Sequence, residues 1–90
     1  MKTSTLLQVA DGETVQTIGQ RVAALQAQAR GLANEHIQAL IDALGVVERL
    51  SGEISSGGEA YPAGIRELAA RLSESSENQA QTIEAILARR

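Results

Sequence analysis

The sequence predicts an all-α protein whose backbone forms an antiparallel helical hairpin. Apolar residues recur three and four positions apart over two long stretches, and this spacing places them on one face of a helix. Between the stretches, the helix breakers gather at Gly57, Gly58 and Pro62. They separate a long helix over about 11–54 from a second helix over about 62–88. No stretch of useful length alternates apolar and polar residues as a strand would.

The chain is predicted to begin with a tail and to continue as one domain. Residues 1–10 are polar and Thr-rich, and we expect them to be flexible, with 11–90 forming a single helical domain. Asp11 is the predicted start of the first helix, because its carboxylate can accept hydrogen bonds from free backbone N–H groups of the first turn. Glu13 adds a favourable negative charge there.

The apolar stripe of the first helix changes phase near Gly31. Either one helix of about 40 residues, roughly 60 Å long, rotates its apolar face, or the chain bends at Gly31. A glycine inside a helix costs about 1 kcal/mol relative to alanine, and no proline lies between Asp11 and Ser51. We therefore predict a continuous helix, with a monomeric three-helix bundle bent near Gly31 as the alternative. The stripe consists of Val15, Ile18, Val22, Leu25, Ala29 and Leu32, and then of Ala33, Ile37, Leu40, Leu44, Val47, Ser51 and Ile54.

The second helix also has one apolar face. Pro62 can occupy its first turn, where the missing N–H group has no partner in any case. Glu67 precedes Arg71 by four residues, a spacing that favours a surface ion pair. The apolar face is expected to consist of Ile65, Leu68, Leu72, Ser76, Ala80, Ile83 and Leu87.

The two helices differ in length, and this difference predicts a dimer. A turn centred near residue 58 places Leu87 opposite about Ala29, so the apolar residues before Ala29 have no partner within the hairpin. Each exposed branched aliphatic side chain forgoes roughly 1.5–3 kcal/mol relative to full burial. Two hairpins related by a two-fold axis would cover these side chains in a four-helix bundle. The expected interface residues are Val15, Ile18, Val22, Leu25 and Leu32.

His36, the only histidine, and Ser76 are polar residues near the middle of the predicted seam. We expect His36, opposite the Ser76 to Ala80 region, to fix the register between helices, as buried polar residues do in coiled coils. Phosphotransfer on His36 is the functional alternative. The His-x-x-Lys-Gly surroundings of such histidines are absent, because Ala39 and Leu40 occupy the Lys and Gly positions.

Composition and spacing argue against several other classes of function. The net charge is −3 and the eight basic residues are scattered, whereas nucleic-acid binding needs a concentrated positive face. One histidine and no cysteine cannot supply a zinc or di-metal site, and His36 cannot be assigned to any serine for nucleophilic catalysis. No apolar run approaches the roughly 20 residues that cross a bilayer. We expect no enzyme activity, cofactor, metal, small-molecule substrate or membrane contact, and a cytoplasmic location.

The sequence thus favours a non-enzymatic helical interaction or scaffold module. It would act through a homodimer and an unknown protein partner. The alternative is a phosphorelay-type signalling component in which His36 accepts the phosphoryl group. Tyr61 next to Pro62 could be a recognition residue, although a ring that covers the end of the bundle is the simpler interpretation. The outer faces that could meet a partner carry Gln16, Gln20, Gln26 and Gln28.

Overall fold

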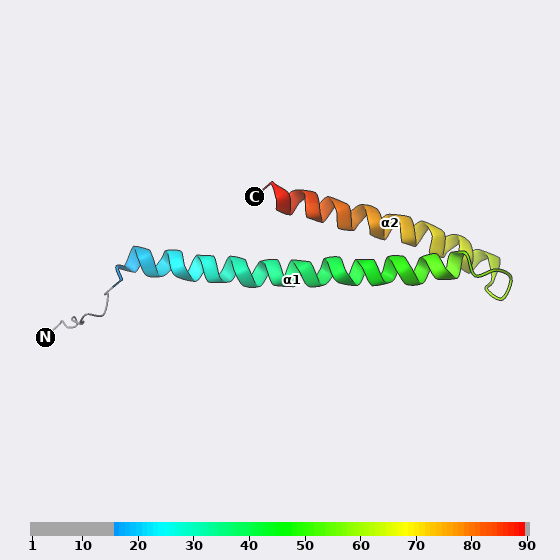
Figure 1. The fold of residues 1–90 in the computed structure, drawn as a ribbon, viewed down its shortest axis with the longest axis horizontal. Coiled ribbons are helices and arrows are strands. Elements are labelled where there is room, and N and C mark those ends of the chain that lie inside the picture. The colour runs from blue at the N-terminus through cyan, green and yellow to red at the C-terminus, as the bar shows by residue number, and fades with distance from the viewer. Residues whose placement is uncertain (1–15, 90) are drawn as a thin grey trace, which may run out of the picture. The chain divides into compact units, whose positions relative to one another are not determined.

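The structure, a computed structural model, describes residues 16–89, which form two helices. α1 spans Ile18–Ser55 and α2 spans Ala63–Ala88 (Figure 1). Residues 16–89 contain no strand, so the all-helical prediction is confirmed for this part of the chain. The predicted tail and the predicted roles of Asp11, Glu13 and Val15 lie outside the described residues.

α1 begins with a reciprocal capping arrangement. Gln16 and Thr17 are not helical, so the prediction of one helix running on from Asp11 is wrong at these two positions. The Thr17 hydroxyl accepts a hydrogen bond from the Gln20 backbone N–H at 3.0 Å, and Gln20 Oε1 accepts one from the Thr17 N–H at 2.8 Å. This capping box satisfies two N–H groups that lack partners at a helix start, which explains why α1 begins at Ile18.

α1 continues through Gly31 without interruption, as predicted. A side chain added at Gly31 would meet no atom within 4 Å, so the glycine is not required by a close contact. The bend on which the three-helix alternative depended is therefore not found at this position.

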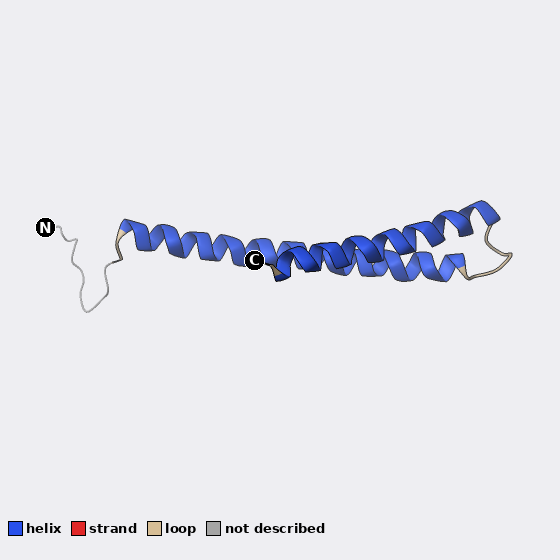
Figure 2. Cartoon of the chain, turned by 90° about the horizontal axis from the view of Figure 1, so that it is seen from above, coloured by secondary structure: helices blue, strands red, loops and turns tan. Residues whose placement is uncertain are grey.

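The chain divides into two compact units, 1–34 and 35–90, with the boundary inside α1. The described part of the first unit contains a single stretch of helix, residues 18–34. The second unit is the predicted helical hairpin, in which α2 packs against residues 35–55 of α1 and runs in the opposite direction (Figure 2).

The turn of the hairpin lies between Ser55 and Ala63. The Gly57 N–H donates to the carbonyl oxygen of Ile54 at 3.1 Å, and the Tyr61 N–H donates to that of Gly58 at 3.1 Å. Gly58 has φ of +85°, a conformation that favours glycine. Pro62 occupies the N-cap position just outside α2 instead of the first turn, as its ψ of 143° is extended, and its side chain makes no capping hydrogen bond.

Small residues are buried together with a large one in the contact between the two helices of the hairpin. Ile41 and Ser51 of α1 and Ala69 and Ser76 of α2 are the buried residues of the described chain. Small side chains allow the two backbones to approach closely, and their burial leaves neighbouring large side chains outside the contact. The predicted apolar faces are confirmed where their residues are buried or half-buried, at Ile37, Leu44, Ser51, Ile54, Ser76, Ala80, Ile83 and Leu87. They are wrong at the exposed positions Ala33, Leu40, Val47, Ile65, Leu68 and Leu72.

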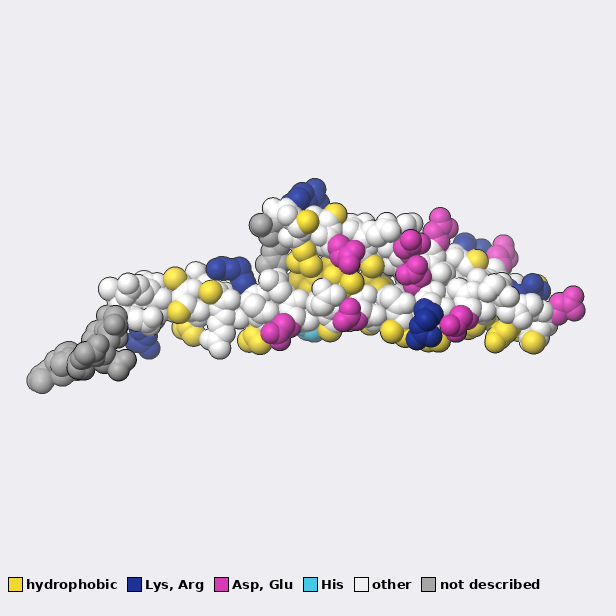
Figure 3. All heavy atoms as spheres, in the orientation of Figure 1, with side chains coloured by type: hydrophobic (Ala, Val, Ile, Leu, Met, Phe, Trp, Pro, Cys, Tyr) yellow, Lys and Arg dark blue, Asp and Glu magenta, His cyan; other side chains and the backbone are white. Residues whose placement is uncertain are grey.

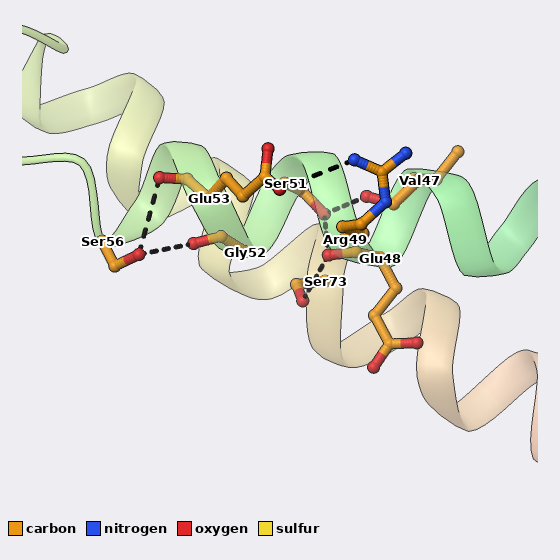
Figure 4. Close-up of polar contacts among 8 residues, drawn as sticks. All are labelled: Val47, Glu48, Arg49, Ser51, Gly52, Glu53, Ser56 and Ser73. Atoms are coloured by element: carbon orange, nitrogen blue, oxygen red, sulfur yellow. Dashed lines mark hydrogen bonds and ion pairs between the residues drawn. The ribbon is translucent and has the colours of Figure 1, made fainter.

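The register of the hairpin also differs from the prediction. The Ser73 hydroxyl donates to the backbone carbonyl oxygen of Glu48 at 3.1 Å (Figure 4). A turn centred at residue 58 would have placed Ser73 opposite about Ala43, more than one helical turn away. The bond corresponds to a turn centred between residues 60 and 61, whereas the helix limits at Ser55 and Ala63 shift the centre only to residue 59 and so explain part of the difference.

Candidate interaction surface

The predicted interface residues in the first unit are exposed. The exposed fraction is 78% for Ile18, 47% for Val22, 64% for Leu25 and 61% for Leu32. Their positions differ by four, three and seven, so they share one face of α1. Residues 18–34 therefore present an apolar stripe to solvent, which we call the N-terminal stripe: Ile18, Val22, Leu25, Ala29 and Leu32.

The hairpin carries a second apolar surface, beside its turn. Leu50 of α1 and Leu68 of α2 are about half exposed and form opposite walls of an open groove of about 280 Å³. We call this open groove the hairpin groove, and its lining is Val47, Leu50, Ser51, Ile54, Ile65, Leu68, Ala69 and Leu72. Figure 3 shows further hydrophobic side chains between the helices toward the C-terminal end of α2, and others along the lower side of α1.

Sequence reasoning missed the hairpin groove because it assigned most of these residues to the seam. The signal that could have revealed it is residue size. Gly52 lies beside Ser73, whose Oγ is 3.5 Å from a Cβ built on Gly52, and Ala69 is buried nearby in α2. Such a run of small residues favours the closest helix contact, and the leucines flanking it are then left for another partner.

The structure places the two predicted register residues in different surroundings. His36 is exposed and lies over a shallow hollow that Ile37, Ala39 and Leu40 also line. Ser76 is only 3% exposed and lies in the seam of the hairpin. Because Ser73 bonds to Glu48, Ser76 lies opposite about Gly45, so the two predicted residues do not meet within one hairpin.

Charge is distributed unevenly between the two surfaces. Residues 18–34 contain Arg21 and Arg30 and no acidic residue, whereas residues 35–89 contain nine acidic residues and four arginines. Two of these arginines form exposed ion pairs with acidic residues four positions away, at 3.5 Å in each case. The N-terminal stripe thus lies on a basic segment and the hairpin groove on an acidic one. The pairs are Arg49 with Glu53 and Glu67 with Arg71, the second of which was predicted.

The described residues contain no group of three or more His, Cys, Asp or Glu side chains that could hold a metal ion. Over the same residues, neither helix combines the length and the apolar content needed to cross a membrane. No protein family, curated protein or solved structure matches the chain.

Proposed function

We propose that the chain is a non-enzymatic helical interaction module that self-associates as a homodimer and binds a further protein. The observation that carries the proposal is the distribution of residue sizes. The hairpin buries three small residues and Ile41 in its seam, while Leu25, Leu50 and Leu68 remain about half exposed or more. Each large aliphatic side chain gains roughly 1.5–3 kcal/mol on full burial, and contiguous exposed patches of this kind mark interaction sites.

A four-helix bundle of two chains is the assembly that this distribution favours. An apolar surface would bury the N-terminal stripe, and an apolar helix would fill the hairpin groove. Two copies supply both at once, because each chain carries one stripe and one groove.

Light scattering of the purified chain tests the proposal directly. We expect the molar mass of a dimer at micromolar concentration. The Leu25→Asp variant should raise the dimer Kd at least about 100-fold, because the substitution removes one buried leucine from each copy. Ala27→Asp is the matched control, because it adds the same charge two residues away on the opposite face of α1. A monomeric unsubstituted chain would overturn the proposal.

The partner-binding part of the proposal rests on the exposed glutamines on the outer faces that lie away from the N-terminal stripe. They are Gln16, which precedes α1, and Gln20, Gln26 and Gln28 of α1. We place this activity in the cytoplasm and assign it no cofactor, nucleic acid, membrane or small-molecule substrate. A photo-crosslinking residue at Gln28 should trap one defined protein in cells, and the same probe at Arg71 should not trap it. Fractionation of the same cells checks the location.

The exposure of His36 favours phosphoryl acceptance as a second candidate function. An acceptor imidazole must be accessible to its donor, and His36 is accessible in the single chain. Incubation with a labelled phosphoryl donor, such as acetyl phosphate, should then label the chain and should not label a His36→Ala variant. Equal labelling of the two proteins would exclude this function.

A further inference from the structure

The two apolar surfaces have the same spacing when they are read in opposite directions. Successive members of the N-terminal stripe, from Ile18 to Leu32, are four, three, four and three positions apart. The apolar line of α1 that borders the hairpin groove has this same spacing when it is read from its C-terminal end. Its members are Ile54, Leu50 and Val47, which line the groove, and Ala43 and Leu40, which continue the line beyond the groove.

Resting on the proposed self-association, we infer that the N-terminal stripe of one copy packs antiparallel on the hairpin groove of a second copy, about a two-fold axis at His36. Leu25 then faces Val47 of the second copy, and Ala29 faces Ala43. His36 is four residues from Leu32 and four from Leu40, so both copies of the contact share one axis. The axis brings His36 beside His36 of the second copy, where a polar pair in an apolar stripe fixes the register.

The groove supplies a second wall for the incoming helix. Ile65, Leu68 and Leu72 project from α2 on the open side of the groove, and each is about half exposed. A helix that lies along Val47 and Leu50 therefore contacts α2 as well as α1 of the second copy. The result is a three-helix contact at each end of the dimer, which covers the large side chains that the hairpin seam leaves outside.

Charge favours the antiparallel arrangement over the parallel one. Antiparallel packing places the basic segment 18–34 on the acidic hairpin, and it brings Arg21 beside Glu53 of the second copy. The Glu53 carboxylate is exposed, and its ion pair with Arg49 leaves it accessible to a second cation. In a parallel pair, Arg21 and Arg30 would lie beside Arg21 and Arg30 of the second copy, and the two acidic hairpins would lie side by side. Repulsion between like charges makes this arrangement unfavourable.

Disulfide trapping tests the inference, because the chain has no cysteine of its own. Leu25→Cys and Val47→Cys are prepared as separate single variants, mixed, and oxidised. We expect most of the crosslinked product to join Cys at 25 to Cys at 47, since a disulfide needs Cβ atoms about 4 Å apart. The double variant should crosslink between chains only, because both positions belong to the same helix, α1, and are about six turns apart along it. Ala27→Cys mixed with Val47→Cys is the control and should give at least 10-fold less of the mixed product.

The outcomes separate the inference from the proposed function. Self-crosslinking of each single variant, with a dimeric molar mass, would show a parallel pair and overturn only the inference. A dimer without a 25-to-47 crosslink would overturn it as well, and a monomer would overturn both. Circular dichroism checks that each variant is helical, and Leu32→Cys with Leu40→Cys repeats the test nearer to the axis.

Discussion

Ser73 of α2 donates a hydrogen bond from its hydroxyl to the main-chain carbonyl oxygen of Glu48 on α1, over 3.1 Å. The same carbonyl oxygen accepts a weaker bond from the Ser51 hydroxyl at 3.3 Å, within α1 (Figure 4). A short serine side chain can reach the backbone of a neighbouring helix only where the two helices approach closely. This bond therefore marks the register of the hairpin and a point of close approach between its two helices.

Replacing Ser73 with alanine should destabilise the hairpin by about 1 kcal/mol, the usual net contribution of a hydrogen bond. The measurement is urea denaturation followed by circular dichroism. Ser75→Ala is the control, because it changes helix propensity in the same way at an exposed position and removes only an exposed bond within α2, from the Gln79 side chain at 3.3 Å. Equal effects of the two substitutions would show that the bond to Glu48 contributes nothing to stability.

The close approach of the helices predicts a strong dependence on side-chain size at Ala69, which is 6% exposed. Ala69→Leu should lower the free energy of unfolding by about 1–3 kcal/mol, because the larger side chain forces the helices apart. Ala70→Leu makes the same substitution at the next, exposed residue and should change stability by less than about 0.5 kcal/mol. Thermal unfolding of the two variants compares them, and a tolerated leucine at position 69 would contradict the close packing.

Sequence periodicity was sufficient to locate both helices. α2 was expected over about 62–88 and spans Ala63–Ala88, and the end expected at residue 54 for the first helix falls at Ser55. These limits were predictable because glycine and proline act locally, through backbone conformation. The start at Thr17 could also have been found, since Thr followed three residues later by Gln is a capping-box signal.

The face that each helix presents to the other could not be predicted from hydrophobicity alone. Apolar residues cover more than one face of α1, and Leu40 and Ile41 are adjacent in sequence, yet only Ile41 is buried. The choice between such faces depends on which side chains let the backbones come close, which is a property of both helices together. The N-terminal stripe could be predicted from the difference in length between the two helices. The hairpin groove could be recognised only once the structure showed which residues form the contact between the helices.

The continuity of α1 through Gly31 predicts that alanine is better than glycine at this position. Gly31→Ala should stabilise the protein by about 1 kcal/mol, because no neighbouring atom obstructs the new methyl group and alanine has the higher helix propensity. Chemical denaturation measures the gain. A loss of stability would indicate that the backbone at Gly31 is not helical in solution.

The capping box at the start of α1 can be tested by amide hydrogen exchange. Thr17→Ala removes the acceptor for the Gln20 N–H and should weaken the first turn by about 1 kcal/mol, which speeds exchange there roughly fivefold. Asp11→Ala is the control and should leave exchange in the first turn of α1 unchanged. Faster exchange in the Asp11→Ala variant, with no change in the Thr17→Ala variant, would indicate that Asp11 starts the helix.

The turn depends on contact between a glycine and an aromatic ring. A Cβ atom built on Gly57 would lie 2.6 Å from Cδ2 of Tyr61, so the ring occupies the space that any side chain at position 57 would need. Gly57→Ala should therefore destabilise the hairpin, by an amount on the order of 1–3 kcal/mol. In a Tyr61→Ala background, the same substitution should cost much less, because the obstructing ring is gone.

Gly58→Ala serves as the comparison, since its cost of about 1 kcal/mol arises from its positive φ and should be the same with or without the ring. A double-mutant cycle by urea denaturation measures both couplings, and additive effects of the substitutions at positions 57 and 61 would show that the ring does not pack on Gly57.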